Sequence, residues 1–191
     1  MADKQQTRRE LILDAAIRLF RRSGYEATGI DDIGAAAGIT GPGVYRHFSS
    51  KQEILDECVT YGASEVLQHA DEILSGDLAP RQALDALVSR LVDDVLSRPD
   101  MVTVLLRERR HLSPAAKGAW TRAVNDYQSE WRSVLGALRP DLDDDAVAAV
   151  IWMALGMALA AAQYDTGYPR DELAAVLHDM LVGSLLGPSD R

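Results

Sequence analysis

The chain has 191 residues and is 47% hydrophobic, which allows one large domain or two small ones with a substantial core. Residues 1–51 carry eight basic and six acidic side chains, whereas the rest carries twelve basic and twenty-three acidic ones. The net charge of −9 therefore excludes a uniformly basic surface, and only the N-terminal end suits a polyanion. The single cysteine, Cys58, excludes an intrachain disulfide and predicts a reducing, cytoplasmic environment.

The first expected helix covers residues 7–23. Thr7 and Glu10 have the spacing of a capping box at a helix start. Apolar residues then recur at intervals of three and four, as on one buried face of a helix. Gly24 supplies the residue that ends the helix. This face predicts the core of a small N-terminal domain.

Residues 28–51 predict two short helices and the start of a third. Thr28 is the expected N-cap of the first, with Asp31 completing a capping box. Gly38 ends that helix, because glycine adopts a left-handed conformation without a Cβ clash. Thr40 is the expected N-cap of a helix over residues 40–48, and Pro42 falls in its first turn.

Two short helices joined by a glycine-containing turn describe a helix-turn-helix, whose second helix enters the DNA major groove. The residues at its start are small, so the backbone can approach the bases closely. The basic, hydroxyl and imidazole side chains around them suit phosphates. The candidate DNA-binding residues are Thr28, Thr40, Gly41, Pro42, Gly43, Tyr45, Arg46, His47 and Lys51.

This stretch resembles the DNA-binding domain of the TetR (tetracycline-repressor) family of transcriptional regulators. The matching positions are Thr28, Asp32-Ile33, Ala37-Gly38-Ile39-Thr40, Val44-Tyr45, His47-Phe48 and Lys51. The resemblance implies a DNA-binding domain over residues 1–50 and a helical ligand-binding and dimerisation domain over 51–191. One departure is Gly41-Pro42-Gly43, where many members carry Lys, Arg, Gln or Thr. Base readout should therefore depend more on Thr40, Tyr45, Arg46 and DNA shape.

The remainder of the chain predicts further helices and no strands. Their expected ranges are 51–75, 80–97, 100–110, 113–138, 143–165 and 169–186. The fold class is thus all-α, with about nine helices. The helix over 51–75 starts beside the motif and ends in the body, so we expect it to transmit changes between the two.

The expected partners are double-stranded DNA, a second copy of the chain and a small-molecule effector, which the apolar lining of the helices suggests is lipophilic or acyl-type. The candidate effector residues are Met101, Leu105, Arg107, His111, Trp120, Tyr127 and Trp152. For Arg107 and His111 the alternative is a favourable position of cations at a helix end. For the aromatic residues the alternative is plain core packing.

Residues 146–162 are apolar throughout, which raises the question of a membrane span. The run is shorter than the roughly 20 residues that a span requires and is flanked by acidic residues, so we expect a helix buried on all sides. Together with the following helix it predicts a four-helix bundle between two copies. The candidate dimer residues are Ala154, Gly156, Ala160, Val176 and Met180.

The sequence gives no indication of catalysis, a cofactor or a metal site. The four histidines fall on four expected helices without metal-ligand spacing. We therefore predict a dimeric, effector-responsive repressor and no enzyme. Two alternatives stay open: a helix-turn-helix regulator without a small-molecule ligand, and a helical carrier or enzyme that does not use its helix-turn-helix.

Overall fold

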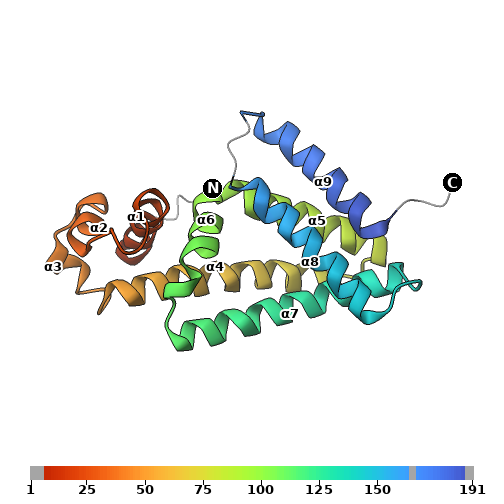
Figure 1. The fold of residues 1–191 in the computed structure, drawn as a ribbon, viewed down its shortest axis with the longest axis horizontal. Coiled ribbons are helices and arrows are strands. Elements are labelled where there is room, and N and C mark those ends of the chain that lie inside the picture. The colour runs from red at the N-terminus through yellow and green to blue at the C-terminus, as the bar shows by residue number, and fades with distance from the viewer. Residues whose placement is uncertain (1–6, 164–166, 188–191) are drawn as a thin grey trace.

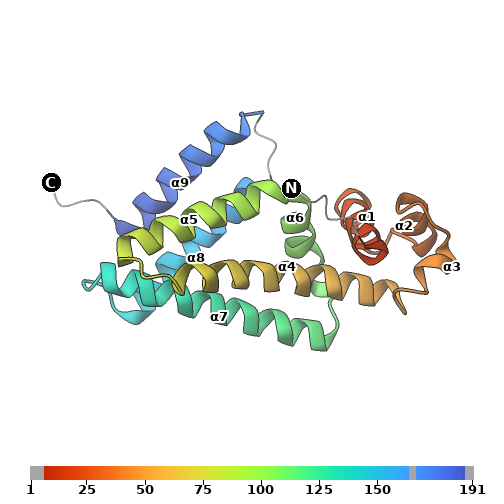
Figure 2. The same ribbon diagram turned by 180° about the vertical axis from the view of Figure 1, so that it is seen from behind.

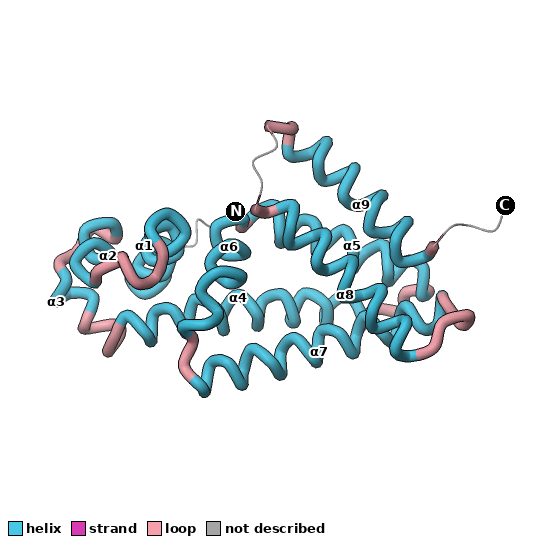
Figure 3. Tube along the Cα trace, viewed as in Figure 1, coloured by secondary structure: helices cyan, strands magenta, loops and turns pink. Residues whose placement is uncertain are grey.

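The computed structural model describes residues 7–163 and 167–187. Within these ranges the chain forms nine α-helices and one short 3-10 helix joined by loops, with no strand (Figure 3). The all-α prediction is confirmed.

The head of the molecule comprises α1 (Arg8–Ser23), α2 (Ile30–Ala36), α3 (Gly41–Val44) and the start of α4 (Lys51–Leu74), at one end of the long axis (Figure 1). These helices enclose the head-side cluster, to which α6 and α7 also contribute. The cluster consists of Ile12, Leu13, Ala16, Leu19, Phe20, Ile33, Val44, Phe48, Ile54, Leu55, Cys58, Val59, Val104, Leu112 and Ala116.

The body is built from α5 (Pro80–Ser97), α6 (Pro99–Glu108), η1 (Arg109–His111), α7 (Pro114–Leu138), α8 (Asp144–Ala161) and α9 (Arg170–Leu186). Most of its apolar residues belong to the body-side cluster, which α5, α7, α8 and α9 supply. The most deeply buried members include Leu84, Val88, Trp131, Leu135, Ile151, Ala158, Leu181 and Leu185.

Helix α4 runs from the head into the body, where it lies along α7 in both views (Figures 1 and 2). Ser50 caps its first turn by accepting a hydrogen bond from the Glu53 N–H at 3.1 Å. Because α4 belongs to both parts, the predicted domain boundary after residue 50 stays a proposal.

Two helices end earlier than predicted. Helix α3 stops at Val44, and the expected continuation to Phe48 is a turn, because a Gly-Pro-Gly start has low helix propensity. Helix α8 stops at Ala161, and part of its expected end, residues 164–165, lies outside the described residues.

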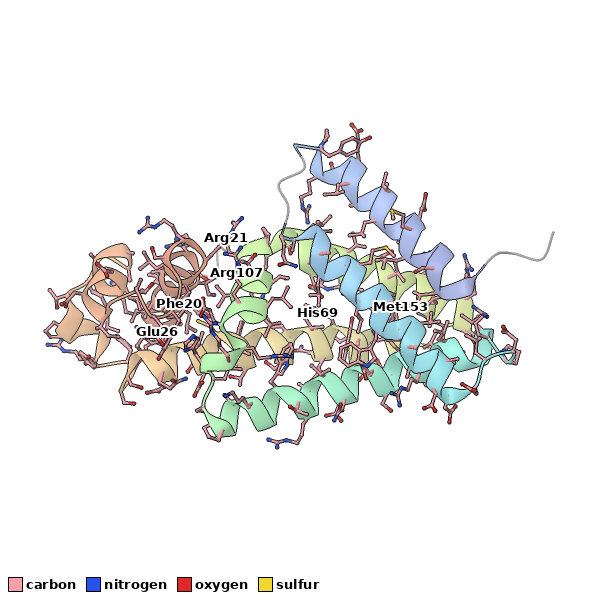
Figure 4. All side chains as sticks on the ribbon, viewed as in Figure 1. Phe20, Arg21, Glu26, His69, Arg107 and Met153 are labelled. Carbon is pink, nitrogen blue, oxygen red and sulfur yellow. The ribbon has the colours of Figure 1, made fainter. Side chains whose placement is uncertain are left out.

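Helix α8 is not buried on all sides by its own chain, and its burial between two copies stays a prediction. It is the one helix among the described residues that is long and apolar enough to cross a membrane by length and composition, with a mean hydropathy of 1.6 and 22% of it buried. Trp152 and Met153 are 53% and 66% exposed, and Figure 4 labels Met153 on this helix. A single chain therefore leaves an apolar face of α8 uncovered.

Candidate nucleic-acid interface

The start of α3 is fixed by its cap. Thr40 Oγ1 accepts a hydrogen bond from the Gly43 N–H at 3.2 Å, as predicted from the sequence. Pro42 lies in the first turn, where its missing N–H leaves no donor unpaired. The hydroxyl oxygen of Thr40 therefore has a structural role, while its O–H remains able to donate outward.

The side chains after the cap alternate between core and solvent. Val44 and Phe48 are four residues apart and are both buried in the head-side cluster. Tyr45, which is 57% exposed, and Arg46 point away from that cluster. Within the described ranges the Arg46 guanidinium makes no ion pair or hydrogen bond. The tip of the head thus presents a phenol and a free guanidinium, two groups that bind phosphates in protein–DNA complexes.

Close packing of α2 on α3 depends on Gly34, which the sequence analysis did not single out. A Cβ at Gly34 would lie 3.0 Å from backbone atoms of Thr40 and Gly41 and 3.1 Å from the Ile39 carbonyl oxygen. Gly41 is buried, and a Cβ there would meet the Asp31 side chain. Gly41 therefore serves packing inside the head, rather than the predicted close approach to bases.

Arg9 joins the end of this turn to α1 and α4. Its guanidinium is paired with Glu57 and Glu53, and it donates a hydrogen bond to the His47 carbonyl. The same group lies 4.0 Å from the centroid of the Phe48 ring. The carboxylate of Glu57 raises the pKa of Arg9 further, so the cation is permanent. No sequence pattern indicated this role, because the partners are far apart in the chain.

Thr28, a predicted DNA contact and N-cap, is not the N-cap in the structure. Its side chain is buried, and its hydroxyl donates a hydrogen bond to the Gly24 carbonyl at 2.8 Å. The N-cap is Gly29, whose N–H donates to the Asp32 carboxylate at 3.0 Å. The capping box lies one residue later than predicted.

Lys51, another predicted phosphate ligand, is bonded within the head. Its Nζ donates to the carbonyls of Tyr25, Glu26 and Thr28 at 2.7, 3.3 and 2.8 Å. It also lies 4.4 Å from the centroid of the Tyr25 ring. These contacts offset the unfavourable position of a cation at a helix start. His47, by contrast, is half-buried beside the tip, and its ring has no partner among the described residues.

The predicted effector residues do not converge on one site. Met101, Leu105 and Trp120 pack against the head-side cluster, whereas Tyr127 packs against the body-side cluster. Met101 also lines a groove of about 820 Å³ between α1, α4 and the start of α6. The aromatic stripe on α7 therefore spans two separate cores.

Two other predicted effector residues face solvent. Arg107 is exposed on α6. Trp152 lies on the uncovered face of α8, so a single chain does not enclose it in a pocket. Periodicity could not assign its direction, because α8 is apolar on every side.

His111 lies at the junction of head and body. Its Nδ1 is 3.2 Å from a Glu26 carboxylate oxygen, and its ring stacks at 5.2 Å on Tyr25. Its carbonyl accepts a hydrogen bond from Gln52 at 2.8 Å. An ion pair between Arg21 and Asp100 joins α1 to the opposite end of α6. η1 therefore contacts both the α1–α2 loop and α4, which are the elements that carry the tip.

The candidate dimer residues divide into two groups. Ala154 is 2% exposed and belongs to the body-side cluster, so its side chain is covered by its own chain. Gly156, Val176 and Met180 are exposed on α8 and α9, and Ala160 is half-buried. The uncovered apolar surface, here called the α8–α9 face, consists of Ala149, Trp152, Met153, Gly156, Ala160, Val176 and Met180.

The described residues contain no group of three or more His, Cys, Asp or Glu side chains that could hold a metal ion. Cys58 is 1% exposed, and burial raises the pKa of its thiol. It is therefore a small apolar core residue and not a thiolate.

Comparisons with family models agree along most of the chain. A model described as "Bacterial regulatory proteins, tetR family" matches residues 12–58. A second, described as "Tetracyclin repressor-like, C-terminal domain", matches residues 77–184.

Known proteins are similar over much the same length. The HTH-type transcriptional repressor KstR2 of Rhodococcus jostii is 30% identical over 143 residues, which cover 71% of this chain and 70% of the relative. The structure of the ketosteroid transcriptional regulator KstR2 of Mycobacterium tuberculosis has a TM-score of 0.76 at 23% identity, covering 95% and 96% of the two chains. AibR, solved with isovaleryl coenzyme A and operator DNA, has a TM-score of 0.76 at 21% identity, covering 91% and 97%.

Proposed function

The chain belongs to the tetR family of bacterial regulatory proteins, and on that premise we propose that it is a cytoplasmic transcriptional repressor that binds a palindromic operator as a homodimer. A small apolar effector, bound in the helical body, releases the dimer from DNA. The relatives named as repressors support the sign of regulation.

The tip of the head is the observation that carries the DNA-binding part of this proposal. Tyr45 and Arg46 are exposed on a turn whose backbone is held by Arg9 and by the buried Phe48. The side chains that contact DNA are then Tyr45, Arg46 and His47. With glycine and proline at the start of α3, much of the sequence preference comes from DNA shape.

The α8–α9 face is the proposed dimer interface. It is apolar, exposed in one chain, and continuous over two packed helices. Two copies related by a two-fold axis would bury it as a four-helix bundle. The two tips would then reach half-sites about one DNA turn or more apart.

The effector is proposed to be lipophilic or acyl-type, because the body is apolar and AibR was solved with an acyl coenzyme A. Its signal would reach the head through α4 and through the contacts of His111 with the α1–α2 loop. A coupling of about 1–3 kcal/mol would change DNA affinity roughly 5–150-fold.

Selection of genomic fragments by the purified protein tests this function. We expect enrichment of a palindrome, bound in fluorescence anisotropy with an affinity that falls steeply with salt. The variant Arg46→Ala leaves the head core intact and removes an exposed guanidinium, so it should bind DNA more weakly than the parent. Absence of DNA binding at every salt concentration would favour the helical carrier or enzyme instead.

A regulator without an effector is the second alternative. A thermal-shift screen of the DNA-binding protein with ketones, fatty acids and acyl thioesters addresses it. Stabilisation by any of these compounds, together with release of the operator, supports the effector. If none of the compounds stabilises the protein, control by abundance or by a protein partner is favoured.

A further inference from the structure

Two buried N–H donors on α7 have no acceptor among the described residues. Gln128 is 5% exposed and Trp131 is 1% exposed. Gln128 Nε2 and Trp131 Nε1 both lack a hydrogen-bond partner. Residues three positions apart lie on the same face of a helix, so both donors belong to the inner side of α7. Buried donors that remain unpaired destabilise a fold, and each such group in a native core requires an explanation.

Apolar packing does not explain the N–H groups of these two residues. Trp131 belongs to the body-side cluster, where its ring buries apolar surface but its N–H contributes nothing to apolar packing. Leu96 and Met157 are only partly buried against the same cluster. The apolar part of a ligand would enter the cluster if side chains of this kind moved, and methionine adapts readily to such changes.

The charge around the two donors disfavours an anionic ligand. The Tyr127 ring packs edge-on at 5.9 Å from Trp131, and its hydroxyl approaches the indole without hydrogen-bond geometry. Burial and the nearby Asp94 raise the pKa of Tyr127, so it stays a neutral phenol. Asp94 is itself paired with Arg90 at 2.7 Å and lies 3.2 Å from His69, which Figure 4 labels in the body.

Glu130 lies on the same helix and is partly exposed. Burial and the neighbouring Asp71 raise the pKa of Glu130 to about 7. A carboxylate placed beside Tyr127 would meet the negative charge of Asp94. A neutral carbonyl oxygen would instead accept hydrogen bonds from the two unpaired N–H groups.

We propose that Gln128 and Trp131 recognise a neutral carbonyl oxygen of the effector, such as that of a ketone, an ester or a thioester, while the apolar part of the effector packs into the body-side cluster. This inference rests on the proposed function, because it assumes that an effector binds in the body. It adds the chemical group that is recognised and the two side chains that recognise it.

The three tryptophans of the chain allow a direct test. In ¹⁵N-labelled protein the indole N–H signals of Trp120, Trp131 and Trp152 are separately observable. The three probes have similar size. Undecan-2-one has a neutral carbonyl group, undecane has none, and decanoate has an ionised carboxylate. We expect undecan-2-one alone to move the Trp131 signal downfield, as a new hydrogen bond does. If no probe moves it, or if decanoate or undecane moves it equally, the inference is overturned.

Variants separate recognition from folding. Gln128→Leu should melt at the same temperature as the parent or higher, since it removes an unpaired donor. Trp131→Phe also removes a donor but leaves space where the larger ring lay, so it should melt somewhat lower. Both should bind DNA normally and lose most of the DNA release that undecan-2-one causes. Ser129→Ala, at an exposed position of the same helix, is the control and should respond like the parent.

The outcomes distinguish the inference from the function beneath it. If the parent binds DNA but both variants respond to the ketone as it does, the inference fails and the regulator stands. If the parent does not bind DNA, the proposed function fails, whichever signal the ketone moves.

Discussion

Gly34 and Gly156 both stand inside helices, but their surroundings are opposite. A Cβ at Gly34 would meet backbone atoms of the α2–α3 turn at 3.0–3.1 Å, whereas a Cβ at Gly156 would meet nothing within 4 Å. Glycine inside a helix costs about 1 kcal/mol relative to alanine. The close approach of α3 explains the glycine in α2. The fold of a single chain offers no such reason for the glycine in α8.

The same contrast extends to the apolar residues of the two regions. Ile33 and Ile54 in the head are 0% exposed, and Met153 on α8 is 66% exposed. The head is therefore complete within one chain. The α8–α9 face has the composition of a core but lacks a cover, which is why we assign its packing to a second copy.

A charge on the α8–α9 face gives the largest expected effect. Gly156→Asp should shift the dimer to monomers, because an unpaired buried charge costs about 3–5 kcal/mol. Gly136→Asp is the matched control, since a Cβ at that exposed position of α7 also meets nothing within 4 Å. Sedimentation velocity over a range of concentrations measures both. An unchanged dimer for Gly156→Asp would mean that the subunits pair elsewhere.

Filling the contact between α2 and α3 should have the next largest effect. Gly34→Ala is expected to lower the free energy of unfolding by about 1–3 kcal/mol, as overpacking does, and to displace the tip. Thermal denaturation and DNA anisotropy would follow both changes. Gly136→Ala should melt like the parent or slightly higher. If Gly34→Ala behaves like this control, the contact between α2 and α3 accommodates a methyl group and is less tightly packed than the distances indicate.

The two basic residues Arg46 and Lys51 should respond differently. Arg46→Ala is expected to weaken binding about tenfold on every DNA sequence and to reduce the salt slope by about one. Lys51→Met should lower the melting temperature and leave the salt slope unchanged, because its ammonium group bonds backbone carbonyls of the head. Anisotropy titrations at several salt concentrations compare them. An equal loss of salt slope in both variants would mean that Lys51 contacts phosphates as Arg46 does.

The smallest expected effect concerns pH. The folded pKa of Glu130, about 7, lies above the unfolded value of 4.5. The native state therefore binds the proton more tightly, and stability falls as pH rises from about 4.5 to 7. Glu130→Gln should stabilise the protein at pH 8 by about 1 kcal/mol, after allowance for solvent screening, and not at pH 4. Melting curves at the two pH values test this, and an equal change at both would exclude the ionisation.

Local signals predicted most of the helix starts. Thr7 and Thr40 both cap helices as expected, because a cap depends only on residues within one turn. The prediction that Thr28 is an N-cap was wrong for a related reason. Thr28 and Gly29 each precede an acid by three residues, and the sequence did not distinguish the two.

Contacts between distant residues could not be predicted. The motif match indicated a DNA-binding role for Lys51, but its partners lie more than twenty residues away in the chain. Trp152 lies in the apolar run over residues 146–162, yet its side chain is 53% exposed, whereas Ile151 beside it is fully buried. In a helix that is apolar all round, spacing alone carries no direction.

The bonds of Lys51 and Arg9 have a mechanical consequence. They tie the first turns of α4 to the α1–α2 loop and to the backbone that follows α3. The loop between head and α4 consequently has little freedom to absorb a displacement. A rotation of α4 would then turn the head as a rigid body. In a dimer, the distance between the two tips would change by the full amplitude of that rotation.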